Sequence, residues 1–311
     1  MTVIIGIDVS KHSLDVYDST QQKHLCFANT NEGIQSLISV YSNYENIKVI
    51  MESTGVYQRL AHKTLEMEGY QVCVVNPLKT RNFAKSAGFL AKTDKVDSRM
   101  LCMYGQKFDL RTTPLRSENH RELESLISYR SALQGELKRH TNYLEYQHCS
   151  ELVCKLMDEH KAKLKADIKN LDKQIKELIN GADNLRKAFE IITSIPGIGT
   201  QAAALLLCEL PELGHSNRKK IAAICGVAPF TCQSGLFRGK STIHGGRKFL
   251  RNGLFMPTLT ARSYNPTIKR FYEHLKKQGK PTKVALIAYM HKLINILNYL
   301  VKTNQMWRDV C

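Results

Sequence analysis

The chain has 311 residues, of which 45 are lysine or arginine and 28 are aspartate or glutamate, so its formal net charge is +17. This basic excess favours a polyanionic partner such as nucleic acid and is unusual for a metabolic kinase. No run approaches the roughly 18 apolar residues of a membrane span, and the start MTVIIGIDVS lacks the basic region of a signal peptide. We therefore expect a cytoplasmic protein without a membrane partner. Its nine cysteines include no CxxC pair, which favours reduced thiols over disulfides.

Residues 1–112 are predicted to alternate strands and helices. The apolar runs VIIGI and IKVIM have the composition of buried parallel strands, and two short alternating segments between them predict a hairpin. Asn31 is the predicted cap of the next helix, and the run YQVCVVNP predicts a strand that ends before Pro77. The order is three strands, helix, strand, helix, strand, helix. It predicts an α/β domain of the RNase H-like type.

Four acidic residues lie where this fold would bring them together. Asp8 and Glu52 each follow one of the two apolar runs, and side chains at the carboxyl ends of parallel strands project from one edge of a sheet. Asp94 and Asp97 are spaced i, i+3, which places them on one face of a helix. Clustered carboxylates repel one another unless a cation holds them, and hard oxygen ligands suit Mg²⁺. The sequence therefore predicts a magnesium site and, in so basic a chain, phosphodiester chemistry on nucleic acid.

The stretch LKTRNFAKSAGFLAK precedes the two helical aspartates. It is basic and contains a glycine, so we interpret it as partly a mobile loop. Lys85 and Lys92 in this region are candidate contacts to nucleic acid.

Residues 113–184 are predicted to be helical. From residue 117 the segment is highly charged and lacks proline, and its apolar residues step by four and three along the chain. These residues are Leu164, Ile168, Leu171, Ile175 and Leu178. The pattern predicts a coiled coil. We favour pairing with a second subunit, and an intramolecular helical hairpin is the alternative.

Residues 185–311 form the third predicted unit, which is mainly helical. Near its start, Gly197 and Gly199 in SIPGIG allow a tight turn that could aim backbone N–H groups at a phosphate, as in a helix-hairpin-helix. A plain turn between two helices is the alternative, and the basic composition favours phosphate contact. The last helix, VALIAYMHKLINILNYLV, is apolar nearly all round and is predicted to be core.

A glycine-rich basic stretch lies between these helices. It contains two hydroxyl candidates, Ser234 and Ser241, and cations that would offset phosphate charge. The cations proposed as nucleic-acid contacts are Arg238, Lys240, Arg247, Lys248 and Arg251. A serine here could attack phosphorus if a base or metal removes its proton. On composition alone it is more often a hydrogen-bond donor to phosphate.

Six segments occur in the same order in a known family. They are GIDVSK, ESTGVY, VVNP, KTDKVDSRML, SIPGIG and GVAP…QSG…RG.S…GGR…R..L.M, and they cover nearly the whole chain. GIDVSK alone also resembles the first strand of actin-like kinases. The ordered set resembles the DEDD transposases of the insertion-sequence-one-ten family, which are relatives of the Piv DNA invertase. Ser98 stands where alanine is common in that family.

This resemblance implies a domain order and a mechanism. Residues 1–112 would form a RuvC-like DEDD domain, 113–184 a coiled coil and 185–311 the transposase domain. The family tetrad maps onto the Mg²⁺ ligands Asp8, Glu52, Asp94 and Asp97. Its nucleophilic serine, in the SG dipeptide after GxxP, is Ser234, with Ser241 in a supporting role.

The family also implies partners. Its members are recombinases that join DNA covalently to serine, and they exchange donor and target strands through a Holliday junction. The best understood use a structured non-coding bridge RNA and assemble as dimers that pair into tetramers. Since Ser234 lies far beyond Asp97 in the chain, the metal site and the nucleophile could come from different protomers.

Three other functions remain open from the sequence. A hydrolytic RuvC-like nuclease or Holliday junction resolvase would use water and form no adduct. A non-catalytic nucleic-acid-binding protein would carry the acidic cluster as a salt-bridged surface. An actin-like ATPase is the weakest alternative, because no second phosphate loop is evident.

Overall fold

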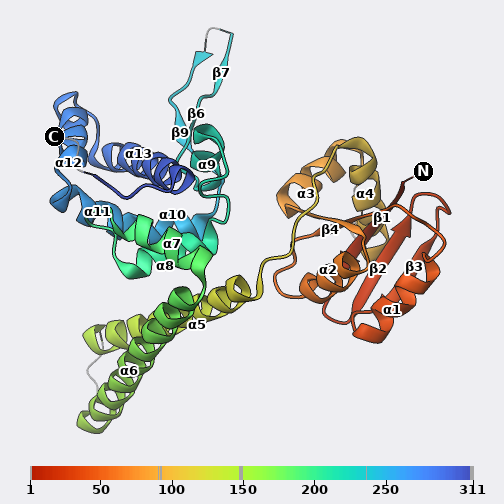
Figure 1. Ribbon diagram of the computed structural model, residues 1–311, viewed down its shortest axis with the longest axis horizontal. Helices are drawn as coiled ribbons and strands as arrows, with labels where there is room; N and C mark the ends of the chain where they lie inside the picture. Colours follow the sequence, from red (N-terminus) through yellow and green to blue (C-terminus); the bar gives the residue numbers. More distant parts are fainter. Residues whose placement is uncertain (1, 90, 92, 147–149, 236, 309–311) are drawn as a thin grey trace. The chain divides into compact units, whose positions relative to one another are not determined.

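The computed structural model describes residues 2–308 apart from 90, 92, 147–149 and 236 (Figure 1). The chain divides into two compact units, Met1–Arg116 and Ser117–Cys311. The first unit is an α/β unit with a mixed parallel and antiparallel sheet, and the second is largely helical.

A five-stranded sheet forms the centre of the first unit. Its strands stand in the order β3-β2-β1-β4-β5, with β1 antiparallel to β2 and parallel to β4. The pair β2–β3 is antiparallel and β4–β5 is parallel. The strands are β1 (Val3–Val9), β2 (Ser13–Asp18), β3 (His24–Ala28), β4 (Ile47–Glu52) and β5 (Gln71–Val75). The predicted hairpin and buried strands are therefore present.

Helices cover both faces of this sheet. Alternate residues of a strand point to opposite faces, so each strand serves two cores. Ile5 and Ile7 of β1 pack with residues of α1 (Asn31–Val40) and α2 (Gln58–Met67). Ile50 of β4 packs on the other face, against residues of α3 and α4. These two helices are α3 (Pro77–Ser86) and α4 (Asp94–Lys107).

One local prediction in this unit was wrong, and another needs a boundary. The basic stretch after β5, expected to be partly a loop, is helical through Ser86 in α3, because Asn76 accepts a hydrogen bond from the Leu78 N–H at 2.8 Å and Pro77 occupies the first helical position. Helix α1 is capped by Thr30, not Asn31: the Thr30 hydroxyl accepts from the Gly33 N–H at 3.2 Å. In both cases the N-terminal cap decides where the helix begins.

The second unit begins with a helical hairpin. Helix α5 (Glu118–Tyr146) lies against α6 (Glu151–Gly181), and their apolar residues form one cluster. This cluster consists of Leu133, Leu164 and Leu171, with Leu126, Leu137 and Ile168 packed against it. The seam predicted for a subunit interface is therefore filled at these positions by the chain's own α5.

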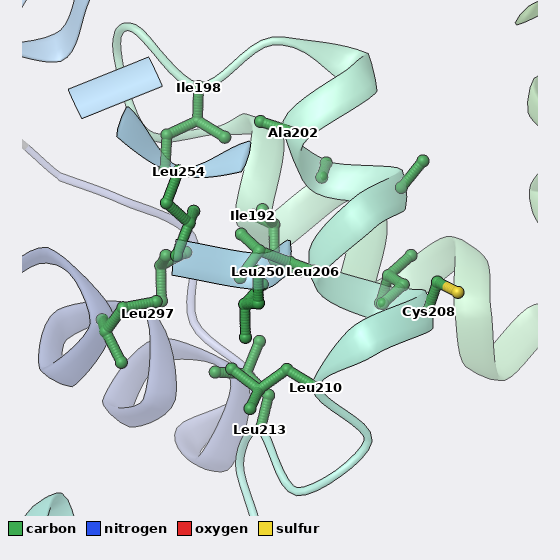
Figure 2. Packing of buried hydrophobic residues seen from close by; sticks show 14 of the residues in the cluster. Ile192, Ile198, Ala202, Leu206, Cys208, Leu210, Leu213, Leu250, Leu254 and Leu297 are labelled. Atoms are coloured by element: carbon green, nitrogen blue, oxygen red, sulfur yellow. The ribbon is translucent and has the colours of Figure 1, made fainter. Parts of the chain in front are cut away.

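The remaining helices pack around a larger core. In Figure 2, Leu206 of α8, Leu250 of α10 and Leu297 of α13 point into one cluster. The helices are α7 (Asp183–Thr193), α8 (Thr200–Glu209), α9 (Arg218–Ile224), α10 (Lys248–Gly253), α11 (Phe255–Tyr264), α12 (Pro266–Lys277) and α13 (Thr282–Thr303). Between α9 and α10 lie short strands that pair as β6–β9 and β7–β8. They are β6 (Pro229–Phe230), β7 (Gln233–Ser234), β8 (Phe237–Arg238) and β9 (Thr242–Ile243).

Helix α13 supplies much of this core, as its composition predicts. Tyr289, Ile294 and Leu297 are fully buried. Among the described residues this helix alone is long and apolar enough to cross a membrane, but 56% of the apolar window is buried inside the protein. A core helix passes the same test of length and composition, so this is weak evidence for a membrane span.

Candidate active site

Asp8 and Glu52 occupy matching positions at the ends of neighbouring strands. The parallel pairing of β1 with β4 sets Ile7 opposite Met51, so the next residue on each strand is one of these acids. Gly6 and Ile50, two residues earlier, both face α4. Because side chains alternate along a strand, both carboxylates point to the face that α4 covers.

Helix α4 reaches this face because β1 has a glycine there. A Cβ atom on Gly6 would stand 2.1 Å from the Ser98 carbonyl oxygen and 2.4 Å from the Cys102 nitrogen. Only glycine allows so close an approach. The helix begins at a cap in which Thr93 accepts from the Val96 N–H at 3.3 Å, and its first turn holds Asp94 and Asp97.

The four carboxylates are electrostatically coupled. Burial, as the largest cause, and then the charges of Asp97, Asp94 and Glu52 together raise the pKa of Asp8 from 3.8 to about 6. Such coupling requires the groups to lie near one another. The charges of Asp94, Asp97 and Glu52 therefore act on Asp8, and the shared role of these four acids stays a prediction.

A fifth carboxylate was not predicted from the sequence. Asp15 stands directly opposite Asp8 in the β1–β2 pairing, and its charge also raises the pKa of Asp8. Asp15 is 8% exposed and lies 2.9 Å from Nε2 of His24. Side chains alternate between the two faces of β2, so Asp15 can be assigned to the α4 face once the register with β1 is known.

Glu52 has a hydrogen-bond partner that was not predicted from the sequence. The hydroxyl of Thr80 in α3 donates a hydrogen bond to Oε1 of Glu52. Thr80 is fully buried, so this bond is shielded from water and fixes the carboxylate orientation. Thr80 lies in the segment interpreted as partly a mobile loop, and its distance from Glu52 in the sequence gave no sign of this contact.

These residues match a divalent cation in the type of their ligand atoms, although no three of them place an oxygen each within 4.8 Å of the others among the described residues. They offer carboxylate oxygens only, which are the ligands that hard divalent ions prefer. The pKa of Asp8 is raised first by burial and then by the neighbouring carboxylates, and both effects disfavour its charged form. A bound cation would relieve this repulsion.

Ser234, the predicted nucleophile, lies in the second unit. It ends β7, where Gln233 pairs with Arg238 and Ser234 with Phe237, and its side chain is exposed. Gly235 follows with a φ of +55°, a conformation that favours glycine in a tight turn. The turn presents the hydroxyl to solvent.

Ser241 has a different environment from Ser234. Its hydroxyl lies 3.0 Å from the hydroxyl of Thr231. This contact links residues beside β6 and β9, the other pair of short strands. Next to them the rings of Phe230 and His244 are stacked with centroids 4.3 Å apart.

The predicted basic contacts fall into two groups. Arg238, Lys240 and Lys248 are exposed and available to a phosphate backbone. By contrast, the guanidinium of Arg247 donates to both carboxylate oxygens of Glu212 at 2.7 Å and to the Glu209 carbonyl at 2.6 Å. Arg247 therefore binds other parts of the protein and has a structural role.

Arg251 is also engaged with the protein. Its Nη1 donates to the carbonyl oxygens of Gly226 and Gly245 at 3.1 and 3.0 Å. The side chain thereby joins the loop after α9 to the loop before α10.

The SIPGIG turn and the basic α3 segment complete the predicted contacts. A Cβ on Gly197, whose φ is +92°, would stand 2.3 Å from Cα of Ala261, so packing against α11 already accounts for this glycine. Gly199 caps α8 and has open space beside it. Lys85 is exposed on α3, and Lys92 lies outside the described residues.

Known proteins resemble the chain over nearly its whole length. Residues 5–147 match a family model described as "Transposase", of the DEDD group of IS110, and residues 189–273 match the "Transposase IS116/IS110/IS902 family". The pilin gene-inverting protein of Moraxella bovis is 30% identical over 97% of this chain and 96% of its own length. The transposase for insertion sequence element IS1328 of Yersinia enterocolitica is 23% identical over 92% of this chain and 96% of its own length. The chain therefore belongs to the IS110 family of transposases, enzymes that act on DNA and generally use a divalent metal.

Proposed function

We propose that the chain is the transposase of an insertion sequence and that it cuts and rejoins DNA at a magnesium site formed by Asp8, Glu52, Asp94 and Asp97. The observation that carries this proposal is the matching position of Asp8 and Glu52 at the ends of neighbouring strands, on the face that α4 covers. The charges of Asp97, Asp94 and Glu52 also raise the pKa of Asp8, after the larger effect of burial. An acidic cluster of this kind in a chain of charge +17 suits a phosphodiester, whose negative oxygens the metal neutralises.

The proposed nucleophile is the Ser234 hydroxyl. Its oxygen would form a bond to phosphorus while the bond from phosphorus to a deoxyribose oxygen breaks, and the serine proton leaves as the departing oxygen gains one. The phosphodiester is conserved as a serine–DNA linkage, so religation needs no external energy. The exposure of Ser234 on a tight turn and the family motif around it support this role.

The protein's own residues would position the reactants. Thr80 holds Glu52 in orientation, while Arg238, Lys240 and Lys248 would contact the DNA backbone. Mg²⁺, when bound, would polarise the scissile phosphate and stabilise charge on the transferring oxygens.

The proposed domain organisation and partners rest on family resemblance. Residues 1–112 would be the RuvC-like domain, 113–184 the coiled coil and 185–311 the transposase domain. A non-coding bridge RNA would pair with donor and target DNA, and the protein would act as a dimer that pairs into a tetramer. The placement of the acids on the strand ends and α4 supports the first assignment.

A denaturing adduct assay tests the proposal. The full chain, Mg²⁺, labelled DNA with the element ends and an RNA transcribed from the flanking sequence are incubated and then denatured. We expect a protein that migrates with covalently bound label only when Mg²⁺ is present. Cleavage without an adduct would instead support the hydrolytic nuclease, and metal-independent binding without cleavage would support a non-catalytic binding protein.

A further inference from the structure

The helical hairpin carries a second cluster of metal-binding side chains, remote in sequence from the four acids. Glu136 and His140 stand one turn apart on α5, and His160 comes from α6. One ligand atom of each residue lies within 4.8 Å of the others. Nε2 of His160 is 3.3 Å from Oε1 of Glu136, and Nε2 of His140 is 3.9 Å from the same oxygen.

These separations suit a small ion between the side chains. A tetrahedral ion with bonds of about 2.0–2.2 Å to nitrogen and oxygen holds its ligands about 3.3–3.5 Å apart. The contact between His160 and Glu136 already has this spacing, and the ligand atoms of the three residues lie within 4.8 Å of one another. Two imidazoles and one carboxylate form a donor set typical of zinc with one position left for water.

The histidine rings favour a metal over a protonated pair. The ring centroids of His140 and His160 are 4.6 Å apart and the rings are stacked at 25°. Two imidazolium charges at this distance would repel each other, and a single carboxylate, Glu136, faces both. In addition, Nδ1 of His140 is buried and has no hydrogen-bond partner among the described residues. A metal bound at Nδ1 would give this nitrogen a partner.

We propose that Glu136, His140 and His160 form a site for a divalent transition metal, zinc in the first instance, that links the two helices of the hairpin. The sequence analysis does not find this set, because its members come from two helices and share no short motif. The site is distinct from the magnesium site in ligand type, since imidazole nitrogen suits zinc and all-carboxylate sets suit magnesium. The link would fasten α5 to α6 beyond the leucine cluster at Leu133 and Leu164.

Metal titration of the full chain tests the proposal. The chelator-treated protein is titrated calorimetrically with Zn²⁺ in excess Mg²⁺, which competes at the acidic site. We compare the wild type with the double variant His140→Gln, His160→Gln and with His215→Gln, an exposed histidine elsewhere in the second unit. We expect the double variant alone to lose one zinc equivalent, and Glu136→Gln to weaken that equivalent by at least about 10-fold. Far-UV circular dichroism checks that each variant is folded.

Cobalt supplies a spectroscopic readout that excludes the thiols. Co²⁺ bound by imidazole and carboxylate gives visible absorption without the near-ultraviolet charge-transfer band of a thiolate complex. We expect this spectrum in the wild type and in His215→Gln, and its loss in the double variant. Equal zinc stoichiometry in all three proteins would overturn the proposal, and so would a purely thiolate cobalt spectrum.

Discussion

The backbone of Gly6 in β1 lies directly against the backbone of Ser98 in α4, so that a methyl group on Gly6 would stand 2.1 Å from the Ser98 carbonyl oxygen. Asp94 and Asp97 lie in the first turn of the same helix, and their charges act on Asp8. The close packing of α4 on β1 therefore depends on the absence of a side chain at Gly6.

Replacing Gly6 with alanine should displace α4 and weaken the metal site. Overpacking of this kind costs about 1–3 kcal/mol of folding free energy. We also expect reduced affinity for Mn²⁺, measured by its electron paramagnetic resonance. Gly135→Ala is the matched control, because a Cβ there meets nothing within 4 Å and alanine favours the helix. If Gly6→Ala bound Mn²⁺ as well as the control, close packing of α4 would not matter for the site.

The metal-free protein should lose stability as the pH rises from about 4 to about 6. The pKa of Asp8 is raised from 3.8 to about 6, so the folded state binds more protons than the unfolded state in this window. The charged form of Asp8 then destabilises the fold at higher pH, by about 1–2 kcal/mol after allowance for solvent screening. Denaturant unfolding at several pH values with a chelator present measures this.

The variant Asp8→Asn separates the pH dependence caused by Asp8 from that of the other titratable groups. The variant should be more stable than the wild type at pH 7.5 without metal, with a flatter pH profile between about 4 and 6. Added Mg²⁺ should stabilise the wild type and leave the variant nearly unchanged. Since protons compete with the metal at Asp8, the Mg²⁺ affinity of the wild type should also fall below about pH 6. A variant less stable than the wild type in chelator would contradict the coupling.

Thr80→Val should weaken metal binding through Glu52. Valine keeps the shape of threonine but removes the hydroxyl that donates to the carboxylate. Loss of such an orienting bond costs about 10–100-fold in metal affinity. Thr80→Ser should restore most of the affinity, as measured by calorimetry with Mn²⁺. If valine and serine bound Mn²⁺ equally, the hydroxyl would be structural only.

Ser234→Ala should abolish the covalent DNA adduct while DNA binding persists. The change removes the nucleophilic oxygen but none of the exposed cations around it. Ser241→Ala is the matched comparison from the same stretch, and it should retain the adduct at a reduced level. Denaturing electrophoresis with labelled DNA measures the amount of covalent adduct in both variants. An adduct in Ser234→Ala would assign the nucleophile elsewhere.

Arg247 and Lys248 should respond differently to mutation although they are neighbours. Arg247→Met removes the hydrogen bonds to Glu212 and to the Glu209 carbonyl and should destabilise the fold by about 1–3 kcal/mol. Lys248→Met should leave the melting temperature nearly unchanged and reduce the salt dependence of DNA binding by about one phosphate contact. Thermal unfolding and binding isotherms at several salt concentrations distinguish the two effects. Equal melting temperatures would show that the Arg247–Glu212 contact contributes little.

Local sequence patterns were sufficient for the sheet and for the acids on its edge. Apolar runs and their lengths identified the strands, and the acid after each run followed from the geometry of parallel strands. The spacing of Asp94 and Asp97 fixed their common helix face. These features depend on neighbours in the chain, which is why they can be read without a structure.

Contacts between distant segments could not be predicted in this way. The pairing of Asp15 with Asp8 depends on the register between β1 and β2. The hydrogen bond from Thr80 to Glu52 depends on helix α3, which was not predicted from its basic sequence. The same holds for Gly197, whose neighbour Ala261 is far along the chain. Arg247 is a further case, because composition suggested phosphate contact and the fold provides Glu212.

The shortness of β7 and β8 has a consequence for control. Two residues on each side form the entire pairing around Ser234, and a ribbon of this size is barely stable by itself. If Ser234 is the nucleophile as proposed, bound nucleic acid would have to align its hydroxyl. The enzyme would then become competent to cut only on a substrate that engages this ribbon.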